Sequence, residues 1–214
     1  MFKKRTASFL KQEIQPIWIF GGNRLSRQTR NRYFFSNMEW SSLKLRNQQE
    51  FYTSYYCPLY KHFLFLHNVL SISSTTASAD LSISSIIKLQ FSQLLTKELS
   101  PKANGLMEWL VLKRQWRCSA YPFSTKIQKQ FRDLSVSNQT SPVLFPVEAG
   151  WPSPHHQWIE TPTYIWQSYL LYFLRSDVPC DVPFTFHNIF PYFKQLTKRE
   201  FIQCRDFSFI NGHY

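Results

Sequence analysis

The expected fold is decided by the stretch Trp109-Leu-Val-Leu-Lys-Arg-Gln-Trp-Arg-Cys-Ser-Ala-Tyr-Pro-Phe-Ser-Thr-Lys-Ile-Gln-Lys-Gln-Phe131. Alternating residues in its first half predict a half-buried strand. Pro122 has no backbone N–H to donate, so the middle of the stretch cannot form part of the hydrogen-bond ladder of a sheet. A second strand-like run extends from Phe131 to Val136. We therefore expect a long basic hairpin that contacts a negatively charged partner. Its cations are Lys113, Arg114, Arg117, Lys126, Lys129 and Arg132.

The composition of the whole chain also favours an anionic partner. The 214 residues carry a formal net charge of +12, and 43% of them are hydrophobic. The apolar fraction suffices for a core, and the length suits one domain with a tail or two small domains. Such a basic chain favours nucleic acid, an anionic membrane surface or an acidic protein over a neutral small molecule.

Residue types that carry chemistry are sparse and scattered. The four cysteines form no close pair, which argues against a structural zinc site. Nothing at the N-terminus resembles a secretory signal, so we expect no disulfide framework. His155, His156 and Glu160 lack a fourth metal ligand, and no nucleophile, paired-carboxylate or phosphate-loop motif is present. We expect no enzyme, no catalytic residue, no cofactor and no metal.

The apolar pattern along the chain predicts a mixed fold. The longest apolar run, Phe63 to Ile72, is too short to span a bilayer, so we expect a soluble chain without membrane insertion. The predicted elements are a strand over 61–74, a turn over 73–80, a helix from about 83 to 99, the basic hairpin, a possible strand at 155–160, a helix from Pro162-Thr163 to Asp177, and a strand over 180–187. This order predicts a ferredoxin-like α+β sandwich, a split βαβ fold with two helices on one face of a small sheet.

The two ends of the chain are expected to be extensions of this sandwich. Residues 1–38 contain eight Lys/Arg and one acid, Glu13. They suit an organelle transit peptide, a permanent arm that neutralises phosphates, or a solvated tail. We therefore expect a basic and aromatic extension over 1–60, a central domain over 61–190 and a C-terminal extension over 191–214.

Short motifs within the central domain resemble ribosomal protein S-ten of the small subunit, in its organellar form. They cover roughly Lys61 to Phe190, although the proline-rich stretch 139–154 replaces a basic segment of that family. The matching residues are Pro122-Phe-Ser-Thr125-Lys126-Ile127, Phe131, Leu134, His155, Ile159-Glu160, Pro162-Thr163, Tyr169-Leu-Leu-Tyr172, Arg175, Val178-Pro179 and Val182.

This resemblance implies a structural rRNA-binding component of the small-subunit head. The implied location is the mitochondrial matrix, with a plastid as the alternative. The implied partners are rRNA and neighbouring ribosomal proteins, without homo-oligomers. The implied RNA-binding residues are Lys113, Arg117, Tyr121, Phe123, Thr125, Lys126, Lys129 and Arg132. Cations would neutralise phosphates, while Tyr121 and Phe123 would stack on bases or pack on a protein neighbour. The alternatives are a large-subunit protein of the same fold (L-forty-eight) and an accessory subunit of a respiratory or ATP synthase complex.

Overall fold

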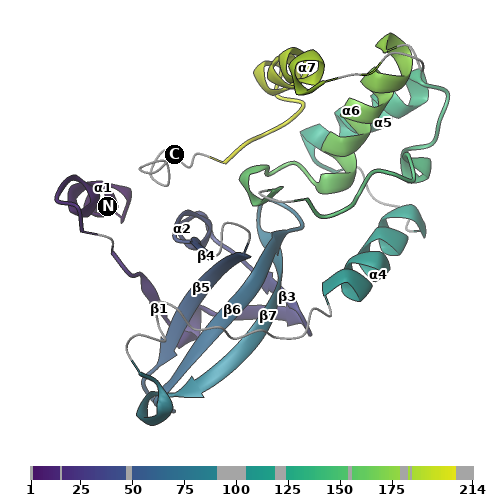
Figure 1. Cartoon of the computed structure of the whole chain (residues 1–214). Helices are drawn as coiled ribbons and strands as arrows, with labels where there is room; N and C mark the ends of the chain where they lie inside the picture. Colours follow the sequence, from purple (N-terminus) through teal and green to yellow (C-terminus); the bar gives the residue numbers. More distant parts are fainter. Residues whose placement is uncertain are drawn as a thin grey trace. The chain divides into compact units, whose positions relative to one another are not determined.

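The protein divides into two compact units, which we describe separately. The structure, a computed structural model, describes residues 2–14, 16–46, 50–90, 105–118, 124–153, 156–178, 183 and 185–205. Unit 1 comprises Met1–Gly105 with Asp206–Tyr214, and unit 2 comprises Leu106–Arg205. Unit 1 contains the sheet, whereas unit 2 is built mainly from helices (Figure 1). The fold is therefore α+β, as expected.

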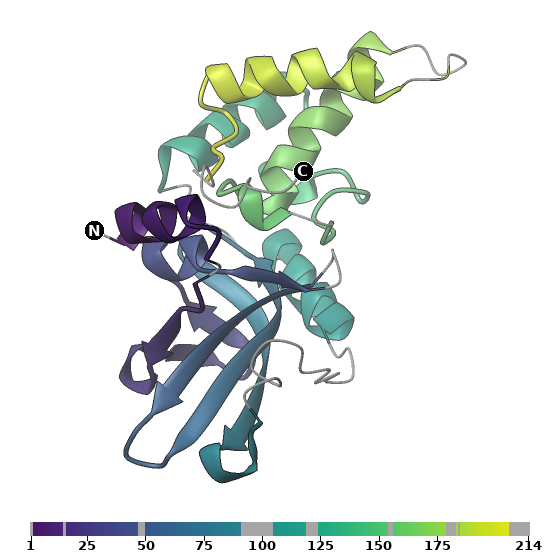
Figure 2. The same ribbon diagram turned by 60° about the vertical axis from the view of Figure 1, so that its left-hand side comes forward.

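Unit 1 is organised around a seven-stranded sheet with the order β1-β5-β6-β7-β3-β2, in which β4 also pairs with β5. Its strands curl over one another (Figures 1 and 2). The β1–β5 pair is parallel, and the other pairs are antiparallel. The strands are β1 (Ile19–Gly21), β2 (Ser26–Thr29), β3 (Arg32–Phe34), β4 (Lys44–Arg46), β5 (Glu50–Cys57), β6 (His62–Ser71) and β7 (Thr76–Ser85). Among the residues of this unit that the structure describes, the α-helices are α1 (Phe2–Lys11) and α2 (Asn37–Ser41).

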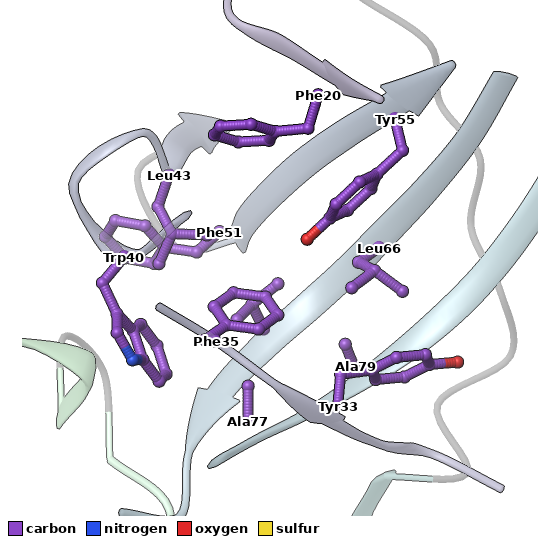
Figure 3. Packing of buried hydrophobic residues seen from close by; sticks show 11 residues of the cluster. Phe20, Tyr33, Phe35, Trp40, Leu43, Phe51, Tyr55, Leu66, Ala77 and Ala79 are labelled. Atoms are coloured by element: carbon purple, nitrogen blue, oxygen red, sulfur yellow. The ribbon is translucent and has the colours of Figure 1, made fainter. Parts of the chain in front are cut away.

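One face of this sheet carries the core of unit 1. Tyr33 from β3 and Phe35 just beyond it point toward Leu66 of β6 and the small Ala77 and Ala79 of β7 (Figure 3). The alanines allow the aromatic rings to approach the sheet closely. The remaining members of the cluster are Phe20, Trp40, Leu43, Phe51, Tyr55 and Val69. Burying this aromatic surface is the main stabilising contribution in this unit.

The short helix α2 closes one end of the core. The Ser36 hydroxyl and the Glu39 side chain form a capping box, and the Ser36 backbone N–H donates to Glu39 Oε2 at 2.8 Å. Tyr55 also donates its hydroxyl to Glu39 Oε1 at 3.3 Å. Burial and the Glu39 charge raise the pKa of Tyr55. Glu39 is therefore a structural acid held by hydrogen bonds from two residues, Ser36 and Tyr55.

In its described residues, unit 2 consists of four α-helices and an irregular loop between α5 and α6 that packs on them. The helices are α4 (Gly105–Cys118), α5 (Lys126–Ser137), α6 (Thr163–Asp177) and α7 (Phe186–Lys198). Tyr164 of α6 lies at the centre of the core, with its ring 5.0 Å from Trp116, 5.8 Å from Phe131 and 5.1 Å from Phe145. Trp109 meets Trp116 edge to face at 5.9 Å. An aromatic cluster thus joins three helices and the loop.

The predicted basic hairpin is wrong. Its first arm is helix α4, and Thr125-Lys126-Ile127 opens helix α5; residues 119–123 lie outside the described part. In α4 the buried side chains are Trp109, Leu112, Lys113 and Trp116, a spacing of three and four that fits a helix. Apolar and polar residues also alternate loosely in this stretch, and the predicted strand rested on that weaker pattern.

Other predicted elements also differ. Residues 76–85 form β7 and Ile86–Lys88 a 3₁₀ turn, where a turn and a helix were expected; residues 91–100 lie outside the described part. Residues 156–158 form a 3₁₀ turn instead of a strand, and α7 begins at Phe186 within the predicted final strand. The predictions for β6 and α6 are confirmed. The strands β5, β6 and β7 follow one another without an intervening helix, so the fold is not specifically ferredoxin-like.

Candidate nucleic-acid interface

Two of the predicted RNA-binding cations of α4 are engaged in holding a loop. Lys113 is 6% exposed, donates to the Val147 carbonyl at 2.5 Å, and lies 4.1 Å from the centre of the Trp151 ring. Arg117 donates to the Phe145 carbonyl at 3.0 Å and covers the Phe145 ring. Burial and the nearby Arg117 charge lower the pKa of Lys113. Both cations fasten the irregular loop to α4.

The other predicted residues lie on or near α5. Thr125 is the N-cap of this helix, and Lys126 forms an ion pair with Glu200 at 2.6 Å. Arg132 pairs with Asp133 at 2.9 Å, whereas Lys129 is exposed. Tyr121 and Phe123 lie outside the described residues. The structure therefore separates the predicted residues into loop anchors on α4 and exposed cations on α5.

A basic hairpin does exist in the protein, but in unit 1. It consists of Arg24 followed by strands β2 and β3, and we call it the arginine hairpin. Its four arginines are Arg24, Arg27, Arg30 and Arg32, and the sequence has no acidic residue between Glu13 and Glu39. All four residues of β2 are exposed, and β2 is the terminal strand of the sheet. The hairpin thus presents positive charge at a sheet edge.

Buried aromatic residues attach the arginine hairpin to the core. Tyr33 lies between Arg32 and Phe34 in β3 and is fully buried, and β3 pairs with β7 through Arg32↔Ser78 and Phe34↔Thr76. The Phe35 backbone N–H donates to the Thr75 carbonyl at 2.8 Å. These buried aromatic residues hold the arginine hairpin against the core. The backbone that carries the exposed arginines is therefore held in position.

The arginines themselves are committed to different degrees. Arg27 closes the turn, because its Nε donates to the carbonyls of Thr29 at 3.1 Å and Arg30 at 2.9 Å. Arg24 covers Phe20 and makes long contacts to Met38 Sδ at 3.6 Å and Ser36 Oγ at 3.5 Å. The Arg30 side chain is exposed and makes no hydrogen bond or ion pair within the described part of the chain. Arg24 and Arg30 are therefore the cations most available to a ligand.

The side chains of the arginine hairpin are suited to binding phosphate groups. Guanidinium groups pair with phosphate oxygens through two parallel hydrogen bonds, and they keep their charge at any physiological pH. Within the described ranges, no carboxylate pairs with Arg24, Arg27 or Arg30. A phosphate that binds there need not displace an internal ion pair. This arrangement suits phosphate-backbone contacts, which position a protein on nucleic acid without reading bases.

A second polar cluster lies on the face of the sheet opposite the core. His67 Nε2 lies 2.8 Å from Ser82 Oγ, and His67 Nδ1 lies 3.6 Å from Glu50 Oε1. The order of groups is that of a nucleophile, a base and a carboxylate. The carboxylate distance is longer than a hydrogen bond, however, and His67 is 0% exposed. We interpret these contacts as polar pairing between strands that compensates for burial.

Comparisons with known proteins find similarity over both units to one kind of protein, a bacterial competence protein. A family model described as "Competence protein CoiA, nuclease-like domain" matches residues 1–99. A second, "Competence protein CoiA, C-terminal domain", matches residues 106–207. The two matches adjoin near the boundary between the units. Each unit is therefore similar to one domain of the same protein, CoiA.

A full-length relative agrees with these two matches. The chain is 25% identical to competence protein CoiA of Bacillus subtilis (strain 168) over 177 residues, which are 82% of this chain and 47% of that protein. The chain thus spans about half the length of that relative. No solved structure matches the chain significantly.

These matches overturn the ribosomal resemblance. The expected rRNA and ribosomal-protein partners, the mitochondrial matrix, and the respiratory or ATP synthase alternative are wrong, because both domain models and the Bacillus relative are CoiA. The structure explains why the motifs misled: Thr125-Lys126-Ile127 and Pro162-Thr163 both begin helices. Helix-start signals of this kind recur in unrelated proteins, so their order does not identify a family.

The arginine hairpin was missed because its cations lie in a segment interpreted as an extension. The phosphate-neutralising arm considered for residues 1–38 included these arginines but gave them no structure. A usable signal was present: Arg27 and Arg32 flank Thr29-Arg30-Asn31, a turn-prone link before the apolar Tyr33-Phe34-Phe35. What the pattern lacked was the partner strand β7, which is more than forty residues further along the chain.

Proposed function

We propose that this chain is a CoiA-type competence protein that binds DNA through the phosphate backbone, with the arginine hairpin as the contact surface. Competence is the capacity of a bacterium to take up DNA, so DNA is the nucleic acid that this similarity favours. The observation that carries the proposal is the group of exposed arginines Arg24, Arg27 and Arg30 in and beside the terminal strand, without carboxylate partners in the described ranges. Counterion release from phosphates would supply the binding free energy.

We further propose that the described residues bind DNA without cleaving it. A metal-dependent nuclease gathers carboxylates around its ions. Among the residues that the structure describes, no group of three or more His, Cys, Asp or Glu side chains could hold a metal ion. Asp80 accepts from the Asn68 amide at 3.0 Å, and Glu39 caps α2, so two buried or half-buried acids have structural partners. Incubation of the purified chain with duplex and single-stranded DNA and Mg²⁺ should leave both intact; cleavage that persists in independent preparations would refute this part.

The binding proposal is tested by removing the least committed arginines. Replacing both Arg24 and Arg30 by Gln should weaken DNA binding in a fluorescence anisotropy titration, and equally for different DNA sequences, because phosphates carry no sequence information. The matched control replaces Lys61 and Lys88 by Gln, two exposed lysines of the same unit. Equal weakening by both variants would reduce the effect to net charge, and unchanged binding in the arginine variant would contradict the proposal.

A further inference from the structure

Helix α7 in unit 2 carries an exposed ridge of two phenylalanines and two lysines. Phe186, Phe190, Lys194 and Lys198 recur every four residues and therefore lie along one side of the helix. Phe186 is 69% exposed and Phe190 39%, and both lysines are exposed. We call this set the α7 ridge. It combines exposed apolar rings with positive charge. These four side chains do not belong to the core or to the contacts of Lys113 and Arg117 with the loop.

The opposite side of α7 holds the helix in unit 2. Tyr192 stacks on Phe173 of α6 with ring centres 3.9 Å apart and planes 14° from parallel. Leu196 is buried, and α7 lies beside α6 in both views (Figures 1 and 2). The Thr185 hydroxyl and the Asn188 side chain form a capping box that fixes the first turn, one residue before Phe186. Because the inner side is anchored, the ridge is preorganised.

The side chains of the ridge are already arranged as a stacking surface. The rings of Phe186 and Phe190 lie 5.1 Å apart at 29°, and Lys194 Nζ lies 4.6 Å from the centre of the Phe190 ring. Neither Lys194 nor Lys198 has a carboxylate partner in the part of the chain that the structure describes. Both rings remain exposed to water, and a lysine ammonium lies beside them.

From this arrangement we infer that the α7 ridge binds single-stranded DNA, with bases stacked on Phe186 and Phe190 and phosphates on Lys194 and Lys198. Bases offer flat apolar faces, and the backbone supplies the complementary negative charge, so one strand satisfies both halves of the ridge. In a duplex the base faces are covered. The inference deepens the proposed DNA-binding function and rests on it. It adds a base-dependent contact in unit 2 to the phosphate contact in unit 1.

The test separates stacking from charge and from simple hydrophobic contact. Replacing Phe186 and Phe190 together by Leu keeps apolar bulk but removes the rings; replacing both by Tyr keeps the rings. The probes are an oligothymidine and an abasic oligonucleotide with the same number of phosphates. The Leu variant should bind oligothymidine at least about fivefold more weakly than wild type and bind the abasic oligonucleotide equally well, while the Tyr variant retains wild-type affinity.

Other outcomes identify what failed. Equal binding of oligothymidine by the Leu variant and wild type would overturn the inference, and so would an equal loss on both oligonucleotides. A vesicle of phosphatidylglycerol is the remaining probe: a ridge that binds vesicles but not oligothymidine is a membrane contact, which also overturns it. If wild type binds both oligonucleotides without preferring bases, only this inference fails. If it binds neither oligonucleotide nor duplex, the proposed function fails with it.

Discussion

Gly150 shows how a single residue supports the loop of unit 2. It is buried and has a φ of 81°, a conformation that favours glycine. Its N–H donates to Gln167 Oε1 at 2.7 Å, and its carbonyl accepts from Trp109 Nε1 at 2.7 Å. A Cβ added there would lie 3.4 Å from the Tyr164 Cβ. Backbone conformation, not lack of space, therefore decides what this position tolerates.

We predict that Gly150→Ala lowers the free energy of unfolding by about 1–2 kcal/mol, the cost of the left-handed conformation for a residue with a Cβ. Urea denaturation followed by tryptophan fluorescence measures this change, since Trp109 contacts the same loop. Val147→Ala is the matched control, because Val147 is exposed in the same loop and should change stability by less than about 0.5 kcal/mol. Equal stability of the Gly150 variant and wild type would refute the conformational argument.

A second residue-scale effect concerns Lys44 in β4, opposite Tyr52. Burial lowers the pKa of Lys44 from 10.5 to about 8. Between these two values the folded protein binds fewer protons at this site than the unfolded chain does, so the contribution of Lys44 to stability rises as pH rises. Below pH 8 the charged ammonium is desolvated in the folded state, and the contribution is at its least favourable.

We predict that wild type gains stability relative to Lys44→Met as the pH is raised from 8 to 10.5. Comparing the two proteins at each pH cancels the titration of other groups. Urea midpoints at pH 7.5, 9 and 10.5 measure the difference. A wild-type-minus-variant difference that does not change with pH would show that Lys44 titrates normally in the folded state.

At the scale of elements, α5 begins with a complete capping box. Gln128 donates its backbone N–H to Thr125 Oγ1 at 3.2 Å, and its side-chain oxygen accepts from the Thr125 N–H at 3.2 Å. We predict that Thr125→Ala lowers the free energy of unfolding by about 1 kcal/mol. Thr125→Ser should keep most of the wild-type stability, because the serine hydroxyl can accept the same hydrogen bond. Thermal unfolding followed by circular dichroism measures both. If the alanine and serine variants are equally stable, the cap contributes nothing.

Elements with one strong local pattern could be predicted from sequence. In β6 the apolar Phe63 to Val69 favour a strand, and in α6 the stripe that follows Pro162-Thr163 fits a helix. In β7 the alternation is complete, with Ala77, Ala79, Leu81 and Ile83 between polar residues. Its small side chains made it resemble a turn, and only the pairing with β6 turns that weak pattern into a strand.

The remaining errors arise from contacts that are distant in sequence. The α4 stretch fits a helix or a strand over a few residues, and the bonds of Trp109 to Gly150 and of Lys113 to Val147 span more than thirty residues. Lys113 and Arg117 looked like free cations because their acceptors are backbone carbonyls, which leave no charge signal in a sequence. The arginine hairpin was unpredictable as an element for the same reason, since β3 joins the sheet through β7.

At the scale of the whole molecule, the net charge of +12 is distributed over both units. Unit 1 presents the arginine hairpin, and unit 2 presents the α7 ridge together with exposed Lys129 of α5. Among the helices of the described ranges, none is long and apolar enough to cross a membrane. Each unit is similar to one of two CoiA domains, so the two proposed DNA contacts lie in different domains.

The most direct test of backbone binding by the arginine hairpin is the salt dependence of duplex DNA affinity. The logarithm of the association constant should fall linearly with the logarithm of salt concentration in wild type. Replacing both Arg24 and Arg30 by Gln should make that slope shallower by about 2, one for each lost phosphate contact. A slope in the variant equal to that of wild type would contradict the account and move the DNA contact away from the arginine hairpin.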